Sequence, residues 1–332
     1  MPGGAFRARR DGPRPTYRPD MITLRTLTKR FGNTAAVDEL TVDIGPGRVT
    51  GFLGPNGAGK STTMRLILGL DRPTAGQALI GGRPYHRLRR PLHEIGALLD
   101  ARAVHPARSG RAHLSAMAAS NGISERRVDE VLATVGLDER AAAKPARALS
   151  LGMGQRLGIA GALLGDPPVL MFDEPVNGLD PDGVRWIRQL TRSLAAEGRT
   201  VLISSHLMSE MQQTADWLVV LGRGRLIADA PTAQVIADSG VAVRVRSPRP
   251  EGLAAVADRL TAAGAVVEPA GTDELTVTGT TAERIGELAY ELGVPLHELA
   301  SHEASLERAF MALTADRVEY AARPARTGGA SA

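Results

Sequence analysis

The chain has 332 residues, of which 43% are hydrophobic and 23% charged, with a formal net charge of +4. This length allows two domains, and the absence of cysteine excludes a disulfide framework and a thiolate metal site. No apolar run is long enough to cross a membrane and the start lacks the apolar region of a secretory signal, so we expect a cytoplasmic protein.

Residues 1–20 contain five arginines among four prolines, which predicts a disordered basic arm. Such an arm can touch anionic lipid or nucleic acid, although a solvated overhang is the commoner outcome of a charge run. Residues 22–53 then carry a strand pattern. Leu40, Val42 and Ile44 alternate with polar residues, Gly45–Gly47 is a predicted turn, and Val49–Leu53 is a further strand.

The next nine residues match the phosphate-binding pattern G-x-x-x-x-G-K-S. They are Gly54, Pro55, Asn56, Gly57, Ala58, Gly59, Lys60, Ser61 and Thr62. A strand precedes them and a predicted helix over 61–70 follows, so backbone N–H groups and the helix N-terminus can surround an anion. Lys60 would reach the β- and γ-phosphates of a nucleotide, and the Ser61 hydroxyl would bind Mg²⁺.

The alternative for this loop is a glycine-rich turn that matches by chance. The chain has only three lysines, Lys29, Lys60 and Lys144, against 37 arginines. A lysine in this position therefore indicates a need for a compact point charge. We predict nucleotide binding.

Helical signals fill about 109–164, including a helix with Val128, Val131, Leu132 and Val135 on one face that stops at Gly136. Predicted strands at 168–172, 200–203 and 217–221 then alternate with predicted helices at 181–196 and 207–214. This alternation predicts a mainly parallel sheet with helices on its faces.

The strand at 168–172 ends in two acids, Asp173 and Glu174, at the edge where parallel sheets bind ligands. Asp173 suits the Mg²⁺ shell, and Glu174 suits a general base for the water that attacks a γ-phosphate. The alternative is a pair of acids that caps the next helix.

Several further motifs resemble those of ABC-type ATPases and occur in that family's order over about 22–229. Leu149–Met153 with Gln155–Leu157 resembles the signature motif, Asn177–Asp180 the D-loop, and Ile203–His206 the switch-histidine strand. Lys29–Gly32 resembles the segment that stacks on adenine. The resemblance implies ATP and Mg²⁺ as ligands, with ATP held between two head-to-tail protomers.

The resemblance also implies individual roles. Ser150 and Gly152 would contact the γ-phosphate held by the partner protomer, and His206 would contact the γ-phosphate and position the water. A histidine at a strand end is more often structural, and only its place among the other motifs favours catalysis. Phe31 would stack on adenine, with core packing as its rival.

Two positions depart from the family pattern. The signature reads Ser-Leu-Gly-Met where Ser-Gly-Gly-Gln is commoner, and Asp100 stands where a Q-loop glutamine is expected. An acid could still bind Mg²⁺ or its water. The following stretch, 101–113, would face a membrane subunit or form a plain surface loop.

The composition changes near Val241, and the order of signals from there is βαββαβ, as in a ferredoxin-like unit. The strands are predicted at 241–246, 266–267, 275–278 and 294–299, the helices at 252–260 and 282–292, and a last helix at 305–313. This part carries no catalytic cluster, which favours a dimerisation or regulatory role. Such an appended domain, with the substitutions above, resembles the ATPase subunits of ABC-2-type drug and antibiotic exporters of the daunorubicin-resistance type.

We therefore predict an α/β ABC cassette at 21–238, with an antiparallel β-subdomain and a helical subdomain at about 100–165, and a small α+β domain at 239–315. Residues 316–332 are predicted to be a disordered tail. The expected function is ATP hydrolysis on the inner face of the cell membrane, driving a separate permease, as a homodimer or an ABC heterodimer and without nucleic acid. Two alternatives stay open: a soluble ABC ATPase acting on nucleic acid or ribosomes, and an importer or lipoprotein-release ATPase. The sequence identifies neither the transported molecule nor whether the dimer is formed by two copies of this chain or by two different cassettes.

Overall fold

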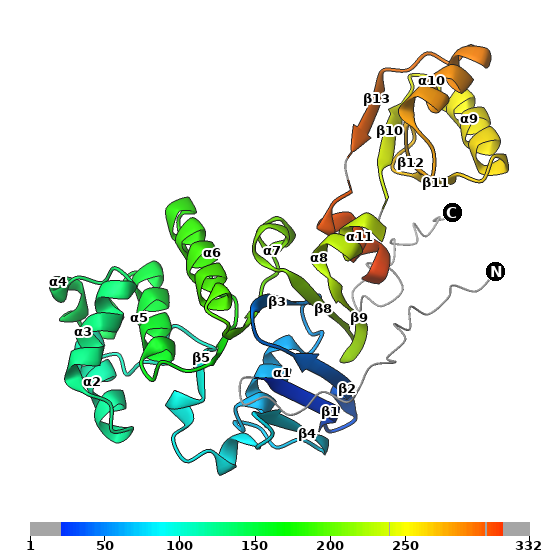
Figure 1. The fold of residues 1–332 in the computed structure, drawn as a ribbon. Helices are drawn as coiled ribbons and strands as arrows, with labels where there is room; N and C mark the ends of the chain where they lie inside the picture. The colour runs from blue at the N-terminus through cyan, green and yellow to red at the C-terminus, as the bar shows by residue number, and fades with distance from the viewer. Residues whose placement is uncertain (1–20, 239, 303, 315–332) are drawn as a thin grey trace, which may run out of the picture. The chain divides into compact units, whose positions relative to one another are not determined.

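The computed structural model describes residues 21–238, 240–302 and 304–314, so the predicted arm at 1–20 and the tail at 316–332 lie outside the described residues. Contacts divide the described chain into a first unit, which runs to Pro231 and also takes in Thr314, and a second that runs from Thr232 to Leu313. Figure 1 labels helices and strands of both units. This division falls between Pro231 and Thr232, whereas the sequence pattern pointed to residue 238. No helix of the described residues is long and apolar enough to span a bilayer.

The first unit contains two sheets. The smaller is antiparallel, in the order β2 (Thr34–Ile44), β1 (Ile22–Phe31), β4 (Ala75–Ile80). The larger has the order β5 (Ile95–Leu98), β6 (Val169–Phe172), β7 (Thr200–Ser204), β3 (Arg48–Leu53), β8 (Trp217–Gly222), β9 (Arg225–Pro231). All its pairs are parallel except β8 with β9, which confirms the mainly parallel sheet.

Helices lie around the larger sheet, and four of them form the helical subdomain (Figure 1). These four are α2 (Gly110–Ser120), α3 (Glu125–Thr134), α4 (Glu139–Ala142) and α5 (Leu151–Leu163). The others are α1 (Lys60–Ile67), α6 (Pro181–Ala196) and α7 (Met208–Thr214). Helix α1 is shorter than predicted because Gly69 adopts φ 64° and its N–H bonds to the Leu66 carbonyl, which closes the last turn.

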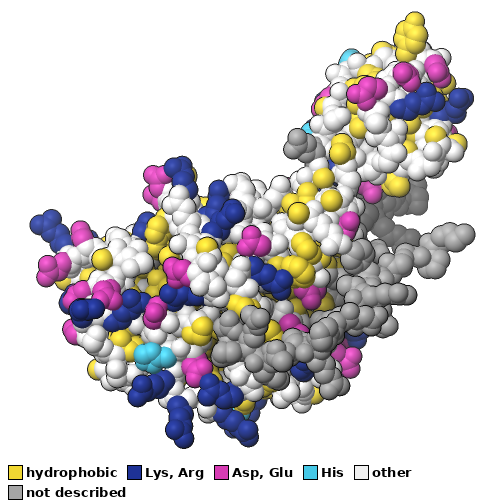
Figure 2. Space-filling view, in the orientation of Figure 1, with side chains coloured by type: hydrophobic (Ala, Val, Ile, Leu, Met, Phe, Trp, Pro, Cys, Tyr) yellow, Lys and Arg dark blue, Asp and Glu magenta, His cyan; other side chains and the backbone are white. Residues whose placement is uncertain are grey.

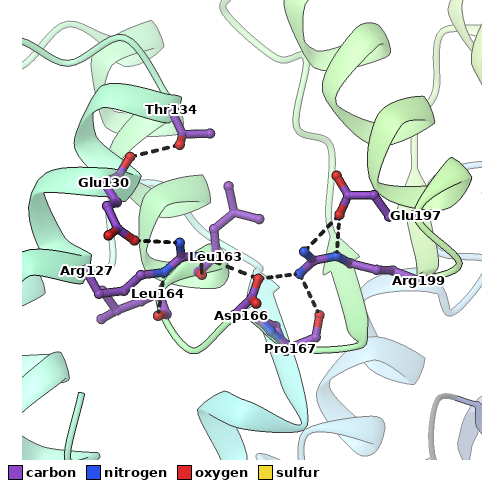
Figure 3. A network of polar contacts seen from close by, with 9 residues as sticks. All are labelled: Arg127, Glu130, Thr134, Leu163, Leu164, Asp166, Pro167, Glu197 and Arg199. Carbon is purple, nitrogen blue, oxygen red and sulfur yellow. Dashed lines mark hydrogen bonds and ion pairs between the residues drawn. The ribbon is translucent and has the colours of Figure 1, made fainter. Parts of the chain in front are cut away.

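A polar network holds the loop between α5 and β6 (Figure 3). Asp166 in this loop accepts from Arg199, just before β7, at 2.8 Å and from Arg127 on α3 at 3.5 Å. Arg127 also donates to the Leu163 carbonyl at 3.0 Å, which is an acceptor at the end of α5. The network therefore fixes the entry of β6, the strand that Asp173 directly follows.

The second unit begins with α8 (Thr232–Asp238) and contains an antiparallel sheet with the order β11, β12, β10, β13. Its elements are β10 (Ala242–Arg246), α9 (Pro250–Ala262), β11 (Val266–Pro269), β12 (Glu274–Thr278), α10 (Ala282–Glu291), β13 (Glu298–His302) and α11 (Leu306–Thr314). The predicted βαββαβ order is confirmed. The last strand was predicted too early, because Val294 is a buried loop residue that packs on Gly252 of α9.

Candidate nucleotide site

The phosphate loop joins β3 to α1, and its glycines are required by geometry. Gly59 has φ 99°, and a Cβ placed on it would lie 2.3 Å from the Ala36 carbonyl oxygen. A Cβ on Gly54 would lie 2.7 Å from the Leu221 carbonyl oxygen. Neither position accepts a larger residue without movement of neighbouring backbone. The loop is therefore pressed against β2 and β8, with the start of α1 directly behind it.

Lys60 is the first residue of α1 and is buried. Its Nζ donates to the carbonyl oxygens of Gly54 at 2.6 Å and Pro55 at 3.2 Å. Burial lowers the pKa of Lys60, while the charges of Glu174 and Asp173 act in the opposite direction. The negative charge of an anion in the loop would offset the cost of burying the charged Lys60 ammonium, which favours phosphate binding.

The acidic pair directly follows β6 and is held by Ser204, the last residue of β7. The Ser204 Oγ donates to Asp173 Oδ1 at 2.5 Å and accepts from the Glu174 N–H at 2.9 Å. Neither acid caps a helix, since α6 begins at Pro181 and is capped by Asp180. The helix-capping alternative for the pair is therefore wrong.

Glu174 contacts His206 across the mouth of the site. The distance between His206 Nδ1 and Glu174 Oε2 is 2.7 Å. The His206 side chain is 51% exposed, so it does not serve as a packed core residue. Glu174 has φ 49°, a conformation that non-glycine residues adopt rarely, and its carbonyl accepts from Gln155 at 3.4 Å.

A cleft of about 640 Å³ joins the loop to this pair. Its lining includes Phe31, Asn56, Lys60, Ser61, Glu174 and His206. The exposed fraction of Phe31 is 54%, which excludes the core-packing alternative. The Lys29 ammonium lies over one face of the Phe31 ring, 4.9 Å from its centre.

Three predicted residues lie away from this cleft. Ser150 is exposed, caps α5 by accepting from the Met153 N–H at 3.2 Å, and lines a different hollow. Gly152 follows in the first turn of α5, close to Leu179. Asp100 accepts from the Arg102 N–H at 2.8 Å, as in a capped turn, and lines a third hollow.

The oxygens of Ser61 and Asp173 are of the type that Mg²⁺ prefers, and Ser204 engages one carboxylate oxygen of Asp173. The described residues contain no cluster of three His, Cys, Asp or Glu that could hold a metal alone. Ser61 and Asp173 would therefore fit a cation whose remaining ligands come from a phosphate and water.

Sequence reasoning missed the contacts of Ser204 and Gln155. Both residues lie within motifs that were recognised, but a motif pattern does not state which side chain bonds to which. Gln155 is buried, and its amide nitrogen reaches the carbonyls of both Glu174 and Asn177 at 3.4 Å. Ser204, which accepts from the Glu174 N–H, and Gln155, which donates to the Glu174 carbonyl, together fix the backbone of Glu174.

Comparison with known proteins gives two family matches. Residues 37–177 match the model described as ABC transporter, and residues 241–307 match a domain of unknown function (DUF8746). The Bacitracin transport ATP-binding protein BcrA of Bacillus licheniformis is 41% identical over 64% of this chain and 70% of its own length. The Lantibiotic transport ATP-binding protein SrtF of Streptococcus pyogenes is 36% identical over 63% of this chain and 90% of its own.

A solved structure with a similar fold is the dimeric MJ0796, a bacterial ABC transporter cassette. It has a TM-score of 0.58 and 24% identity, and the match covers 64% of this chain and 98% of that one.

Proposed function

Because the chain belongs to the family of ABC transporter ATPases, we propose that it hydrolyses ATP to drive export through a separate membrane permease. The observation that carries this proposal is that three segments meet at the phosphate loop: Lys60 and His206 line one cleft with Glu174, and the charge of the neighbouring Asp173 acts on Lys60. The names of the two relatives give bacitracin and a lantibiotic as the molecules that those proteins help to transport. Export of an antibiotic or drug is the corresponding proposal for this chain.

In the proposed mechanism, the loop amides and Lys60 bind the β- and γ-phosphates. Glu174 accepts a hydrogen bond from the attacking water and takes its proton, while His206 contacts the γ-phosphate and holds the Glu174 carboxylate. The water oxygen bonds to the γ-phosphorus while the bond between that phosphorus and the bridging oxygen breaks, and ADP and phosphate leave. Ser61 and Asp173 would hold Mg²⁺, which neutralises charge on the phosphates when it is bound.

The site is proposed to be completed by a second protomer. Ser150 and the first turn of α5 offer a hydroxyl and N–H groups to an anion, yet they do not line the Lys60 cleft of their own chain. A head-to-tail dimer would bring them to the partner's γ-phosphate. The partner is a second copy or another ABC cassette.

We propose that the permease docks on two adjoining hollows, which lie where the helical subdomain meets the segments around α1 and β5. They have volumes of about 350 and 410 Å³ and share Ala101, Val104 and Leu157. An apolar segment of a membrane protein fits such a surface. The chain would then lie on the inner face of the membrane.

The variant Glu174→Gln tests the catalytic proposal. It keeps size and hydrogen bonding but removes the base, so turnover should fall about 100- to 10,000-fold while ATP binding persists. The control is Glu291→Gln, an exposed glutamate in the second unit, which should keep full turnover. Full turnover in Glu174→Gln would contradict the mechanism.

The rival function is an ABC ATPase that acts on nucleic acid or ribosomes. Co-purification of an integral membrane protein with the full chain would support the transporter. ATPase activity that rises with added RNA or DNA, with no membrane protein recovered, would support the rival.

A further inference from the structure

A second feature of the first unit lies outside the nucleotide site. Residues 83–93, here called the basic segment, connect β4 to β5 and contain four arginines, two histidines and no acid. Figure 2 shows Lys and Arg side chains along the lower edge of the molecule, where Figure 1 draws the cyan stretch between β4 and β5. The segment is a local concentration of positive charge.

Most of this charge is not neutralised by neighbours. Arg83 pairs with Glu94 at 2.7 Å. Arg87, Arg89 and Arg90 are exposed and have no carboxylate partner among the residues that the structure describes. Some exposed arginines elsewhere in the unit are paired, such as Arg65 with Asp71 and Arg225 with Asp38, whereas Arg72 and Arg108 also lack a carboxylate partner among the described residues. The three unpaired guanidinium groups therefore leave their donors available to an external anion.

The basic segment is anchored to the core. Leu88, between two of the exposed arginines, is 8% exposed and belongs to the core cluster. Tyr85 packs against the same cluster, and burial raises the pKa of its hydroxyl. Arg87 lies in the 3₁₀ turn at Tyr85–Arg87, and Arg89 and Arg90 lie between this turn and the one at Pro91–His93. Fixed backbone lowers the entropy that must be lost when the side chains bind.

The basic segment also adjoins the surface proposed for the permease. The Tyr85 Cβ lies 3.5 Å from the position that a Cβ on Gly69 would occupy. Leu68 and Leu70, on either side of Gly69, line the hollow that contains Asp100. Leu70 is 56% exposed. A permease segment in this hollow would bring the bilayer surface close to the exposed arginines.

We propose that the basic segment binds anionic phospholipid headgroups of the inner leaflet through Arg87, Arg89 and Arg90, which holds the cassette against the membrane beside its permease. The placement rests on the proposed function. Guanidinium groups match phosphate oxygens in pairs, and anionic leaflets attract clusters of basic residues. Nucleic acid fits less well, because Tyr85, the only Phe, Tyr or Trp of the segment, packs against the core cluster and does not stand free for bases to stack on.

The test uses the full chain and vesicles of phosphatidylcholine, with or without one third phosphatidylglycerol, in a sedimentation assay. The variant replaces the three exposed arginines of the basic segment with Gln. A charge-matched control replaces three exposed arginines that already have partners on their own helix: Arg126, Arg185 and Arg284.

The basic-segment variant should lose about 100-fold in partitioning to the anionic vesicles at low salt, whereas the control should lose only a few-fold. Vesicle binding that is unchanged in the variant, or reduced equally in both proteins, overturns the proposal. The proposal is also overturned if the basic-segment variant loses binding to RNA or DNA while it still binds the vesicles. ATPase activity in solution should not change in either protein, so a negative result here is distinct from failure of the Glu174→Gln test.

Discussion

Replacing Ser204 with Ala removes a hydroxyl that contacts both members of the acidic pair. In the wild type, this hydroxyl holds the Asp173 carboxylate and accepts the Glu174 N–H. Ser204 is fully buried, so water does not readily replace it. Ala fits the same space, and the substitution therefore removes the two hydrogen bonds without overpacking.

The expected effect on stability is about 2–4 kcal/mol. A hydrogen bond to a charged group contributes about 1.5–3 kcal/mol, and a buried N–H without an acceptor costs about 1–3 kcal/mol. The two contributions overlap because they share one oxygen. The effect on catalysis follows from position: Glu174 is held at an unfavourable φ, and small displacements of a catalytic base cost roughly 10- to 100-fold in turnover.

The assay pairs ATPase kinetics with urea unfolding and ATP-binding titration. Ser204→Ala should lower kcat about 10- to 100-fold with little change in ATP affinity, and Ser204→Thr, which keeps the hydroxyl, should recover much of the loss. Ser205→Ala is the matched control, since the Ser205 hydroxyl bonds only to the Leu207 N–H at 3.0 Å among the contacts of the described chain. If Ser204→Ala keeps kcat within about twofold of the Ser205→Ala value, the positioning argument is refuted.

Three further predictions concern pH, the loop and the adenine side. Burial and, secondarily, the charge of Arg108 lower the pKa of His113 below its usual value of 6.5. The contribution of His113 to the free energy of unfolding is therefore present above pH 6.5 and is lost as the pH falls toward the folded-state pKa. The variant His113→Phe should flatten this loss of stability at acid pH in unfolding titrations, and an unchanged slope would contradict the prediction. Gly59→Ala should lower the melting temperature and abolish ATP binding, because its Cβ would overlap the Ala36 carbonyl and the strain costs at least about 2 kcal/mol. Phe31→Ala should weaken ATP binding about tenfold without lowering kcat at saturation, while Phe31→Tyr should bind normally; equal affinity in all three proteins would rule out stacking.

The parallel sheet and the order of motifs were predictable from sequence because their signals are local. A fully apolar run such as Val169–Phe172 identifies a buried strand, and its burial is confirmed. Strand β9 was missed because Arg225–Pro231 is an edge strand with mostly half-buried side chains and no alternation. Val294 misled the prediction of the last strand, since an apolar residue in a buried loop resembles a strand residue.

The site was predictable as a set of residues but not as a set of contacts. The position of Asp100 after β5 suggested a metal ligand, whereas its carboxylate bonds to the Arg102 N–H and it lines a hollow away from Lys60; its role in the metal site stays a prediction. Phe31 could be assigned to either core or cleft until its exposure was known. Contacts between segments far apart in sequence, such as Ser204 with Asp173, depend on sheet order, which periodicity does not encode.

The central claim is that the phosphate loop is half of a site whose other half is Ser150 to Met153 of a second protomer. Analytical ultracentrifugation of Glu174→Gln with and without ATP tests it most directly, alongside the double variant Glu174→Gln/Ser150→Arg. The account predicts that Glu174→Gln dimerises when ATP is added, and that the double variant binds ATP but stays monomeric. A Glu174→Gln protein that binds ATP as a monomer, or a double variant that dimerises equally well, would contradict it.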